Sequence, residues 1–155
     1  DLDANTIVVG TNQGGLIRVR WSGTGWTKTA LTSPASRYIS CIAVDPTNPQ
    51  RLWITMSQIG GPSVYRSDDG GSTWSNCTAN LPGIPINAVV VDPANYQRVW
   101  VAADVGVYET SDLGSGWTPF GSGLPNAMVV DLILHRQDRM LIGATRNRGA
   151  WAIQV

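Results

Sequence analysis

The feature of this chain that most restricts its fold is an internal repeat of 43 to 47 residues. Two pairs of segments match at a spacing of 47: Arg51-Leu52-Trp53-Ile54 with Arg98-Val99-Trp100-Val101, and Val44-Asp45-Pro46 with Val91-Asp92-Pro93. Three segments match at steps of 43: Ser63-Val64-Tyr65, Gly106-Val107-Tyr108 and Gly149-Ala150-Trp151. Units of this length are typical of propeller blades with four short antiparallel strands, and also of helical repeats.

The periodicity within the unit favours strands. No stretch repeats apolar residues at helical spacing over helical length, whereas Asn87-Ala88-Val89-Val90-Val91 is short, β-branched and closed by Asp92-Pro93. The composition agrees, because 17 Gly, 9 Pro and 7 Trp accompany a single Glu and a single Lys, which are common helix formers. The sequence therefore predicts an all-β fold.

The length of 155 residues is that of about one domain. We predict a single partial β-propeller over residues 1–155, with blade parts at 1–30, 39–78, 86–120 and 128–155. The predicted strands of the last three units are Ile39–Val44, Leu52–Met56, Ser63–Arg66, Thr73–Cys77, Ile86–Val91, Val99–Ala103, Gly106–Glu109, Trp117–Phe120, Met128–Leu134, Met140–Thr145 and Gly149–Ile153.

The repeat alignment leaves the two end units incomplete. Asp1 aligns just past the end of a first strand, and the last unit has no fourth strand. We expect about three and a half blades, with three, four, four and three strands and an open blade edge at each end. Open edges pair readily with other strands. The remaining part of a longer propeller, which we favour, or self-association would cover them.

Charge, cysteine content and hydropathy exclude several classes of protein. Lys+Arg and Asp+Glu balance at 11 each, which excludes a basic footprint for nucleic acid, and no apolar run reaches the ~20 residues of a membrane span. Cys41 and Cys77 are assigned to the first and fourth strands of one unit, roughly 14 Å apart. A disulfide needs Cα atoms within about 7 Å, so we predict none between them.

One segment matches a known motif in full. Ser67, Asp69, Gly71, Thr73 and Trp74 fit the pattern Ser-x-Asp-x-Gly-x-Thr-Trp. A second copy, with Thr110, Asp112, Gly114 and Trp117, has Thr for the first Ser and Gly116 for the Thr, and residues 19–26 keep only Gly23 and Trp26. This motif is the Asp box, and the chain resembles the Asp-box propellers of the bacterial neuraminidase repeat family, which include sialidases, xyloglucanases and sortilin-like proteins.

The resemblance implies a structural role for the boxes. Asp69 and Asp112 can accept backbone N–H groups of the turn, Gly71 and Gly114 can adopt positive φ, and Trp74 and Trp117 can cover the adjoining apolar layer. In the family, the boxes lie on the face away from the active site. The resemblance also implies a secreted, cell-surface or periplasmic bacterial protein.

Ligands of propellers usually bind on the face opposite the boxes. The loops expected there are 12–15, 57–62, 104–105 and 146–148, with the inter-blade segments 37–38, 82–85 and 125–126. From these loops we select Arg37, Tyr38, Asp104, Asn126, Arg146 and Arg148 as candidate ligand-binding residues. Carboxylates and guanidinium groups bind sugar hydroxyls or anions, although solvated loop charges are the simpler interpretation of each.

Catalytic chemistry has few candidates. A sialidase would need an arginine triad, a Tyr–Glu nucleophile pair and an acid/base Asp, but Glu109, the only glutamate, lies on the opposite strand face from Tyr108. A glycosidase needs two carboxylates at ~5 to 9.5 Å, and the pair we consider is Asp104 and Asp131. Because Asp131 interrupts an apolar strand, we expect it near the central channel with His135 or an arginine as its partner.

Cofactor sites are not indicated. His135 is the only histidine, no His/Cys/Asp cluster has metal-ligand spacing, and Gly10–Gly15 lacks the Lys-Ser/Thr ending of a phosphate loop. We expect Trp53, Trp100, Trp74 and Trp117 in the core, with Trp21 and Trp26 freer to be exposed.

Two functional hypotheses remain. The first is a non-catalytic scaffold or module that binds a carbohydrate or a protein. The alternative is the C-terminal part of a glycoside hydrolase propeller, sialidase- or xyloglucanase-like, whose active site is completed by residues outside this chain.

Overall fold

The computed structural model describes residues 5–121 and 127–155. In this part of the chain the regular structure consists of 14 strands in four antiparallel sheets. The sheets hold three, four, four and three strands, and in each sheet neighbouring strands are consecutive in sequence. The predicted all-β class and the predicted distribution of strands are therefore confirmed. No helix in the described residues is long and apolar enough to cross a bilayer.

The strands are grouped as follows. The first sheet holds β1 (Thr6–Gly10), β2 (Leu16–Trp21) and β3 (Trp26–Leu31). The second holds β4 (Ile39–Asp45), β5 (Asn48–Met56), β6 (Val64–Ser67) and β7 (Ser75–Asn76). The third holds β8 (Ile86–Val91), β9 (Val99–Ala103), β10 (Gly106–Thr110) and β11 (Thr118–Phe120). The fourth holds β12 (Val129–His135), β13 (Met140–Thr145) and β14 (Ala150–Gln154).

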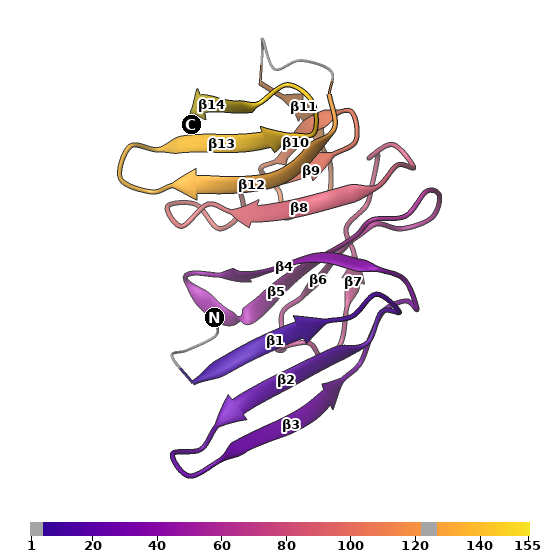
Figure 1. Ribbon diagram of the computed structural model, residues 1–155, viewed down its shortest axis with the longest axis vertical. Coiled ribbons are helices and arrows are strands. Elements are labelled where there is room, and N and C mark those ends of the chain that lie inside the picture. Colours follow the sequence, from indigo (N-terminus) through magenta and orange to yellow (C-terminus); the bar gives the residue numbers. More distant parts are fainter. Residues whose placement is uncertain (1–4, 122–126) are drawn as a thin grey trace.

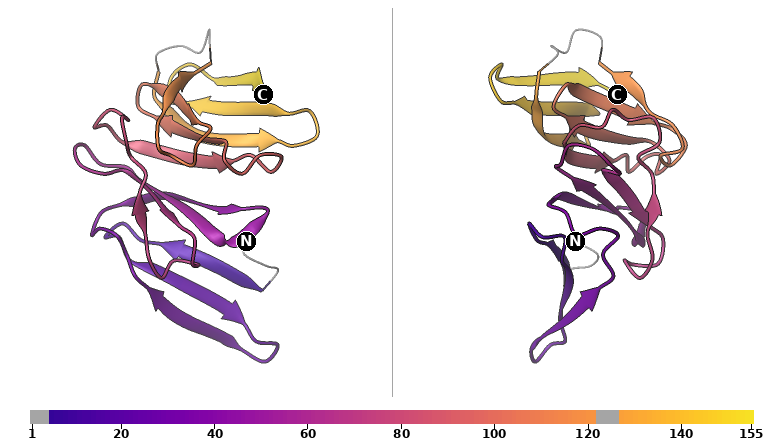
Figure 2. Two further views of the ribbon diagram at one scale, coloured as in Figure 1. Left: turned by 180° about the vertical axis from the view of Figure 1, so that it is seen from behind. Right: turned by 90° about the vertical axis from the view of Figure 1, so that its right-hand side faces the viewer.

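The four sheets follow one another in chain order along the molecule (Figure 1). The first and fourth sheets lie at opposite ends of this row, as the two further views confirm (Figure 2). Each sheet therefore meets the next sheet face to face, and the first strands β4, β8 and β12 are neighbours.

Most strand ends lie within one residue of those expected, but β5 starts at Asn48 instead of Leu52, and the strands that follow the two boxes start late. The strand expected to start at Thr73 starts at Ser75, and the one expected at Trp117 starts at Thr118. The N–H of Thr73 is bound by the Asp69 carboxylate and the N–H of Trp117 by the Asn80 side chain, so neither group is free to pair with the adjacent strand. The turn expected over 45–49 is also tighter, since Asp45 already pairs with Asn48.

Apolar side chains fill each junction between sheets. Leu52 and Ile54 of β5 lie on the face turned to the first sheet, and Trp53 lies on the face turned to the third sheet; all three are fully buried. Trp100 takes the corresponding place between the third and fourth sheets. The middle sheets are thus apolar on both faces, and they are stable only with a sheet on each side.

In the first Asp box, side chains close the turn between β6 and β7. The Asp69 Oδ1 atom accepts the N–H groups of Ser72 (3.0 Å) and Thr73 (2.9 Å), and its Oδ2 atom accepts the Thr73 hydroxyl (2.6 Å). The Ser67 hydroxyl donates to Asp69 (2.7 Å) and accepts the N–H of Gly71 (2.7 Å), whose φ is 91°. Together these hydrogen bonds hold the pKa of Asp69 far below its ordinary value, and the bond from the Thr73 hydroxyl contributes most.

The second box repeats this geometry between β10 and β11. Asp112 Oδ1 accepts the N–H groups of Ser115 (2.9 Å) and Gly116 (3.1 Å). Thr110 takes the role of Ser67: its hydroxyl donates to Asp112 (2.6 Å) and accepts the N–H of Gly114 (3.1 Å). The Thr110 hydroxyl is the main cause of the lowered pKa of Asp112. Gly116 offers no hydroxyl, so the bond made by Thr73 in the first box has no counterpart.

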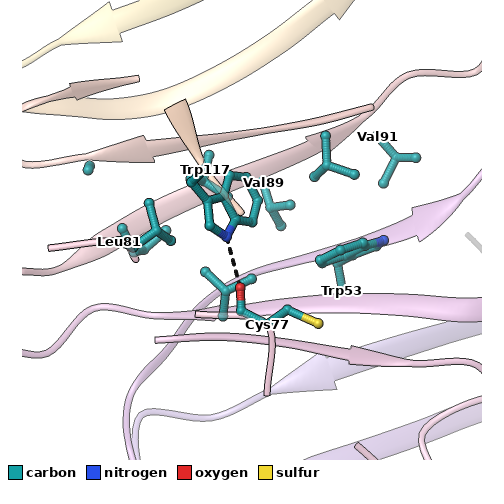
Figure 3. Packing of buried hydrophobic residues seen from close by; sticks show 11 residues of the cluster. Trp53, Cys77, Leu81, Val89, Val91 and Trp117 are labelled. Carbon is teal, nitrogen blue, oxygen red and sulfur yellow. Dashed lines mark hydrogen bonds between the residues drawn. The ribbon is translucent and has the colours of Figure 1, made fainter. Parts of the chain in front are cut away.

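The box tryptophans also join each sheet to the preceding one. The Trp117 indole N–H donates to the Cys77 carbonyl at 2.8 Å in the core between the second and third sheets (Figure 3). The Trp74 indole N–H donates in the same way to the Thr32 carbonyl, which follows the first sheet, at 2.8 Å. Asn80 supports the Trp117 contact by bonding both the N–H and the carbonyl of Trp117 (2.8 Å each).

An arginine from the third strand of a repeat makes a reciprocal contact. Arg18 donates to the Gly70 carbonyl in the first box, and Arg66 donates to the Leu113 carbonyl in the second box at 2.8 Å. Arg18 and Arg66 occupy the same place in the repeat, since each pairs across its sheet with Val8 or Trp53 on the strand before. Each box is therefore a joint between two sheets as well as a closed turn.

The third and fourth sheets are joined differently. The Arg139 guanidinium forms a two-pronged ion pair with the Asp92 carboxylate, at 2.6 and 2.7 Å. This contact holds the pKa of Asp92 below its usual range.

Cys41, on β4, and Cys77, just after β7, are both free thiols, and burial raises the pKa of each.

Trp117→Phe is expected to destabilise the fold. The change keeps an aromatic ring in the core but leaves the Cys77 carbonyl without its buried donor, which costs about 1–3 kcal/mol. Trp74→Phe is the matched control, since its carbonyl partner Thr32 is exposed and water can replace the indole. Urea unfolding would measure both variants. Equal losses of stability would contradict the argument from burial.

Asp69→Ala is expected to lower the melting temperature, most of all at neutral pH. The folded-state pKa of Asp69 is depressed, so its contribution to stability is complete above the unfolded value of ~3.9 and is lost as the pH falls toward the folded value. Thermal melts across this range should show a shallower acid-side decline for Asp69→Ala than for the parent. Asp138→Ala, at an exposed aspartate outside both boxes, is the control.

Candidate functional site

The loops opposite the boxes in the second, third and fourth sheets lie along one edge of these sheets, here called the upper face, where hydrogen bonds link neighbouring sheets. One backbone hydrogen bond recurs at the start of these loops in each of the three sheets. Each bond joins the residue just after the second strand of a repeat to the residue just before its first strand. The three bonds run from Ser57 N to the Tyr38 carbonyl (3.2 Å), from Asp104 N to the Pro85 carbonyl (3.4 Å) and from Arg146 N to the Met128 carbonyl (3.0 Å). The backbone there is uniform, whereas the side chains Ser57, Asp104 and Arg146 differ in charge.

A second recurring feature is a β-bulge near the start of each first strand. The register of these strands skips one residue, at Ser40, Asn87 and Val130. The Ser40 hydroxyl donates to the Ile86 carbonyl (2.6 Å), and the Asn87 amide donates to the Val129 carbonyl (2.9 Å). Each of these two bulges therefore turns a polar side chain toward the following sheet, as bulges commonly re-aim a side chain.

Asn87 organises a polar group of three residues, of which the sequence analysis selected only Asp104. Its amide N–H group donates to Asp104 Oδ1 (3.0 Å), and its carbonyl oxygen accepts the Ser57 hydroxyl (3.1 Å). We call Ser57, Asn87 and Asp104 the Asn87 cluster. All three residues are half-buried, so their side chains are held in place yet reach solvent. The sequence did carry a signal: Ser40 and Asn87 are polar residues at the same place in two apolar strands, 47 residues apart.

Arg37 and Tyr38 lie on the same face, beside the second sheet. The Arg37 guanidinium donates to the Gly60 carbonyl and lies against Gly61, so it holds the 57–62 loop. Gly60 in turn donates to the Gly83 carbonyl (3.1 Å) and links this loop to the next inter-sheet segment. The Tyr38 side chain is 49% exposed and is free to pack against a ligand.

Arg146 and Arg148 line a depression of about 380 Å³ together with Ala127, Met128 and Asn147. Both arginines are exposed, and within residues 5–121 and 127–155 neither forms an ion pair. Two unpaired guanidinium groups on one depression provide a site for an anionic or hydroxyl-rich ligand. The remaining candidate of this group, Asn126, lies outside the described residues.

Asp131 does not have the expected partner. It is exposed, follows the bulge of β12, and accepts the N–H of Leu132 (2.8 Å). His135 instead lies 3.1 Å from Asp138 in the next turn. The expectation of a His135 or arginine partner was wrong because the bulge turns Asp131 out to solvent, where a carboxylate needs no counter-charge.

The Glu109 carboxylate is bound within the fold and is not a candidate for catalysis. Its carboxylate accepts the Arg98 guanidinium (3.0 Å) and the Trp100 indole N–H (2.8 Å). These contacts link Glu109, on β10, to β9 and the residue before it, and Tyr108 is not among its partners. A larger depression of about 680 Å³ lies beside it, but its charged residues Glu109 and Asp112 are already bound within the fold. In the described residues no group of His, Cys, Asp and Glu is arranged to hold a metal ion.

The sequence matches no family model and no curated protein. Solved structures do resemble it: a GH74 enzyme of Niastella koreensis (19% identity, TM-score 0.69), an auxiliary nutrient binding protein from Bacteroides thetaiotaomicron (13%, 0.73), and YCF48 bound to a D1 peptide (16%, 0.65). The alignments cover 97%, 94% and 94% of this chain but 26%, 34% and 46% of those chains. The four sheets are thus a partial β-propeller, and each sheet is one blade or part of one.

Asn87→Asp is expected to destabilise the upper face in a pH-dependent way. The new carboxylate would face Asp104 at about the present 3.0 Å and would lose the donor to the Val129 carbonyl. Like charges raise the folded-state pKa of such a pair, so stability is complete below the unfolded value of ~3.9 and falls as the pH rises. The loss at pH 7 should be about 1–3 kcal/mol.

Urea unfolding at a series of pH values measures this effect. Asn87→Leu is the control, because it removes the same hydrogen bonds without adding a charge. A pH profile for Asn87→Asp that is parallel to that of Asn87→Leu would show that Asp104 is not close enough to interact.

Proposed function

We propose that this chain is a non-catalytic propeller segment whose upper face binds a hydroxyl-rich ligand, with a glycan as the class that fits best. The observation that carries the proposal is the Asn87 cluster. An amide, a carboxylate and a hydroxyl are bonded to one another in fixed orientation, at the edge of solvent. Sugar hydroxyls both donate and accept hydrogen bonds, so a group with fixed donors and acceptors matches them.

The neighbouring residues support this ligand class. Tyr38 offers an exposed aromatic ring of the kind that covers the apolar face of a sugar, while Arg146 and Arg148 offer donors along the same face. Among the similar structures, one is described as a nutrient binding protein and another is bound to a peptide. A peptide ligand would use the same donors and is the competing outcome of the test.

The carboxylates argue for binding rather than catalysis. Asp104 is held by an amide donor from Asn87, and Asp131 is held by the backbone of its own strand. Glycosidase chemistry needs one carboxyl group kept protonated as the acid and a second one as base or nucleophile. Both aspartates instead accept donors from within the fold, which suits carboxylates that hold a ligand hydroxyl in place.

Glycan-array binding followed by titration tests the proposal. Asp104→Ala and Arg146→Ala should each weaken the affinity for a bound glycan by about tenfold, which corresponds to ~1.4 kcal/mol. Asp138→Ala, remote from the upper face, should leave it unchanged. Asp69→Ala should also leave it unchanged at a temperature where the variant is folded. An array without any glycan binder, or a loss in Asp138→Ala equal to that in Asp104→Ala, would count against a glycan site.

The alternative is that the chain forms part of a glycoside hydrolase propeller. The resemblance to a GH74 enzyme over 97% of this chain is the observation that favours it. Fluorogenic glycosides separate the two functions. Turnover that is abolished by Asp104→Asn or Asp131→Asn would support the hydrolase, whereas glycan binding without turnover supports the binding module.

A further inference from the structure

The hydrogen bonds of the Asn87 cluster determine which of its atoms donate and which accept. The Asn87 side-chain nitrogen donates to Asp104 Oδ1 (3.0 Å) and to the Val129 carbonyl (2.9 Å). Carboxylate and carbonyl oxygens only accept hydrogen bonds, so both partners require the amide nitrogen on their side. The Asn87 oxygen then faces the Ser57 hydroxyl, which donates its hydrogen to it (3.1 Å).

The atoms of the cluster that stay open to a ligand are therefore acceptors. Both hydrogens of the Asn87 amide and the hydroxyl hydrogen of Ser57 are used in the bonds just described. Ser57 Oγ keeps its lone pairs, and Asp104 Oδ2 forms no hydrogen bond within residues 5–121 and 127–155. A ligand at this cluster has to supply the hydrogen-bond donors.

Asp104 also brings a negative charge that has no ion-pair partner in the described part of the chain. Two arginines of the upper face contact other groups: Arg37 donates to the Gly60 carbonyl, and Arg146 Nη1 lies 3.9 Å from Met128 Sδ. Asp104 is half-buried. A carboxylate that is partly removed from water and unpaired favours a positively charged group on the ligand.

The neighbours of the cluster in sequence supply no side-chain donor. Val105, which follows Asp104, and Val130, the bulge residue of β12, are apolar and exposed. Residues 1–4 and 122–126, which the structure does not describe, include no Lys, Arg or His. A cationic donor for Asp104 is therefore left to the ligand.

We propose that the Asn87 cluster binds a protonated amino group, so that the glycan recognised by the upper face contains amino sugars with a free amine. This inference rests on the proposed function, since it takes a glycan as the ligand and specifies the group that is recognised. An ammonium group carries a positive charge and three N–H donors, and it accepts no hydrogen bond. It donates to Asp104 Oδ2, while the hydroxyl on the adjacent ring carbon donates to Ser57 Oγ.

A neutral sugar matches the cluster less well. Each hydroxyl that donates to Asp104 or Ser57 also brings an oxygen that needs a donor of its own, and the cluster has none left to offer. A hydrogen bond between an ammonium group and a carboxylate is roughly twice as strong as one between neutral groups. An N-acetylated amine has lost the charge and keeps one N–H, so it loses both advantages.

Three oligosaccharides of equal length and β-1,4 linkage test the proposal: oligomers of glucosamine, N-acetylglucosamine and glucose. Calorimetric titrations in a buffer acidic enough to protonate the amine should show the parent binding the glucosamine oligomer about tenfold more tightly than either of the others. Asp104→Asn keeps the size of the side chain and an acceptor for Asn87 but removes the charge. It should lower the affinity for the glucosamine oligomer about tenfold and abolish the preference.

Asp138→Asn is the matched control, because it makes the same change at an exposed aspartate outside the upper face. It should keep the preference of the parent, and circular dichroism confirms that each variant is folded. The comparison of the three oligosaccharides on the parent needs no variant. A loss of preference in Asp138→Asn as large as in Asp104→Asn would overturn the proposal, since it would reflect overall charge.

The remaining outcomes separate this inference from the proposed function. A parent that binds all three oligosaccharides equally, or a glycan array whose binders carry no free amine, would overturn the amino-group inference while leaving a glycan ligand in place. A parent that binds no glycan would overturn both. Trilysine is included as a peptide probe, and its binding in an Asp104-dependent way, without binding of any glycan, would assign the ammonium site to a peptide and overturn the amino sugar.

Discussion

The two middle sheets of this protein are apolar on both of their faces, and the rest of the structure depends on that constraint. A single sheet of three or four short strands cannot bury its own apolar faces, so it needs neighbouring sheets. Leu52 and Trp53 are adjacent in sequence, point to opposite faces of β5, and are both fully buried. Burying both requires a sheet on either side, which produces a row of sheets in chain order.

Polar contacts determine how the sheets are joined, and most of them converge on the Asp boxes. A pair of adjacent aspartates such as Asp68 and Asp69 has the appearance of acid–base chemistry. Yet Asp69 is bound by the turn that it closes, and Asp68 accepts the guanidinium groups of Arg51 and Arg66. The box also carries the indole donor and the carbonyl acceptor that link it to the preceding sheet. Its carboxylates are therefore fully used in stabilising the fold.

The upper face has the opposite character. Its backbone repeats the same hydrogen bond in three successive repeats, whereas the residues that form it are Ser57, Asp104 and Arg146. A constant backbone with changing side chains separates stability from recognition, as loops on a rigid scaffold commonly do. For this reason the box variants and the upper-face variants are expected to affect different properties: the former the stability of the fold, and the latter the affinity for a ligand.

The sequence alone determined the strands, their number in each sheet and the geometry of the boxes, because these depend on residues close together in the chain. Thr110 makes the same two hydrogen bonds in the second box as Ser67 in the first, because either hydroxyl can both donate and accept within four residues. The starts of β7 and β11 were predicted too early. The N–H groups of Thr73 and Trp117 donate to the side chains of Asp69 and Asn80, so they do not form the backbone hydrogen bonds between strands that the sequence pattern predicts.

Only the tertiary structure decided which polar groups meet. The bond from Asn87 to Val129, the contact of Arg66 with the second box and the pairing of Asp92 with Arg139 join residues more than 40 positions apart. No local pattern encodes such contacts, since they arise from the order and spacing of packed sheets. The bulge that exposes Asp131 depends on the pairing of β12 with β13 in the same way. Sequence spacing supplied the repeat, and packing between repeats decided which side chains are buried, which are bound and which remain open to a ligand.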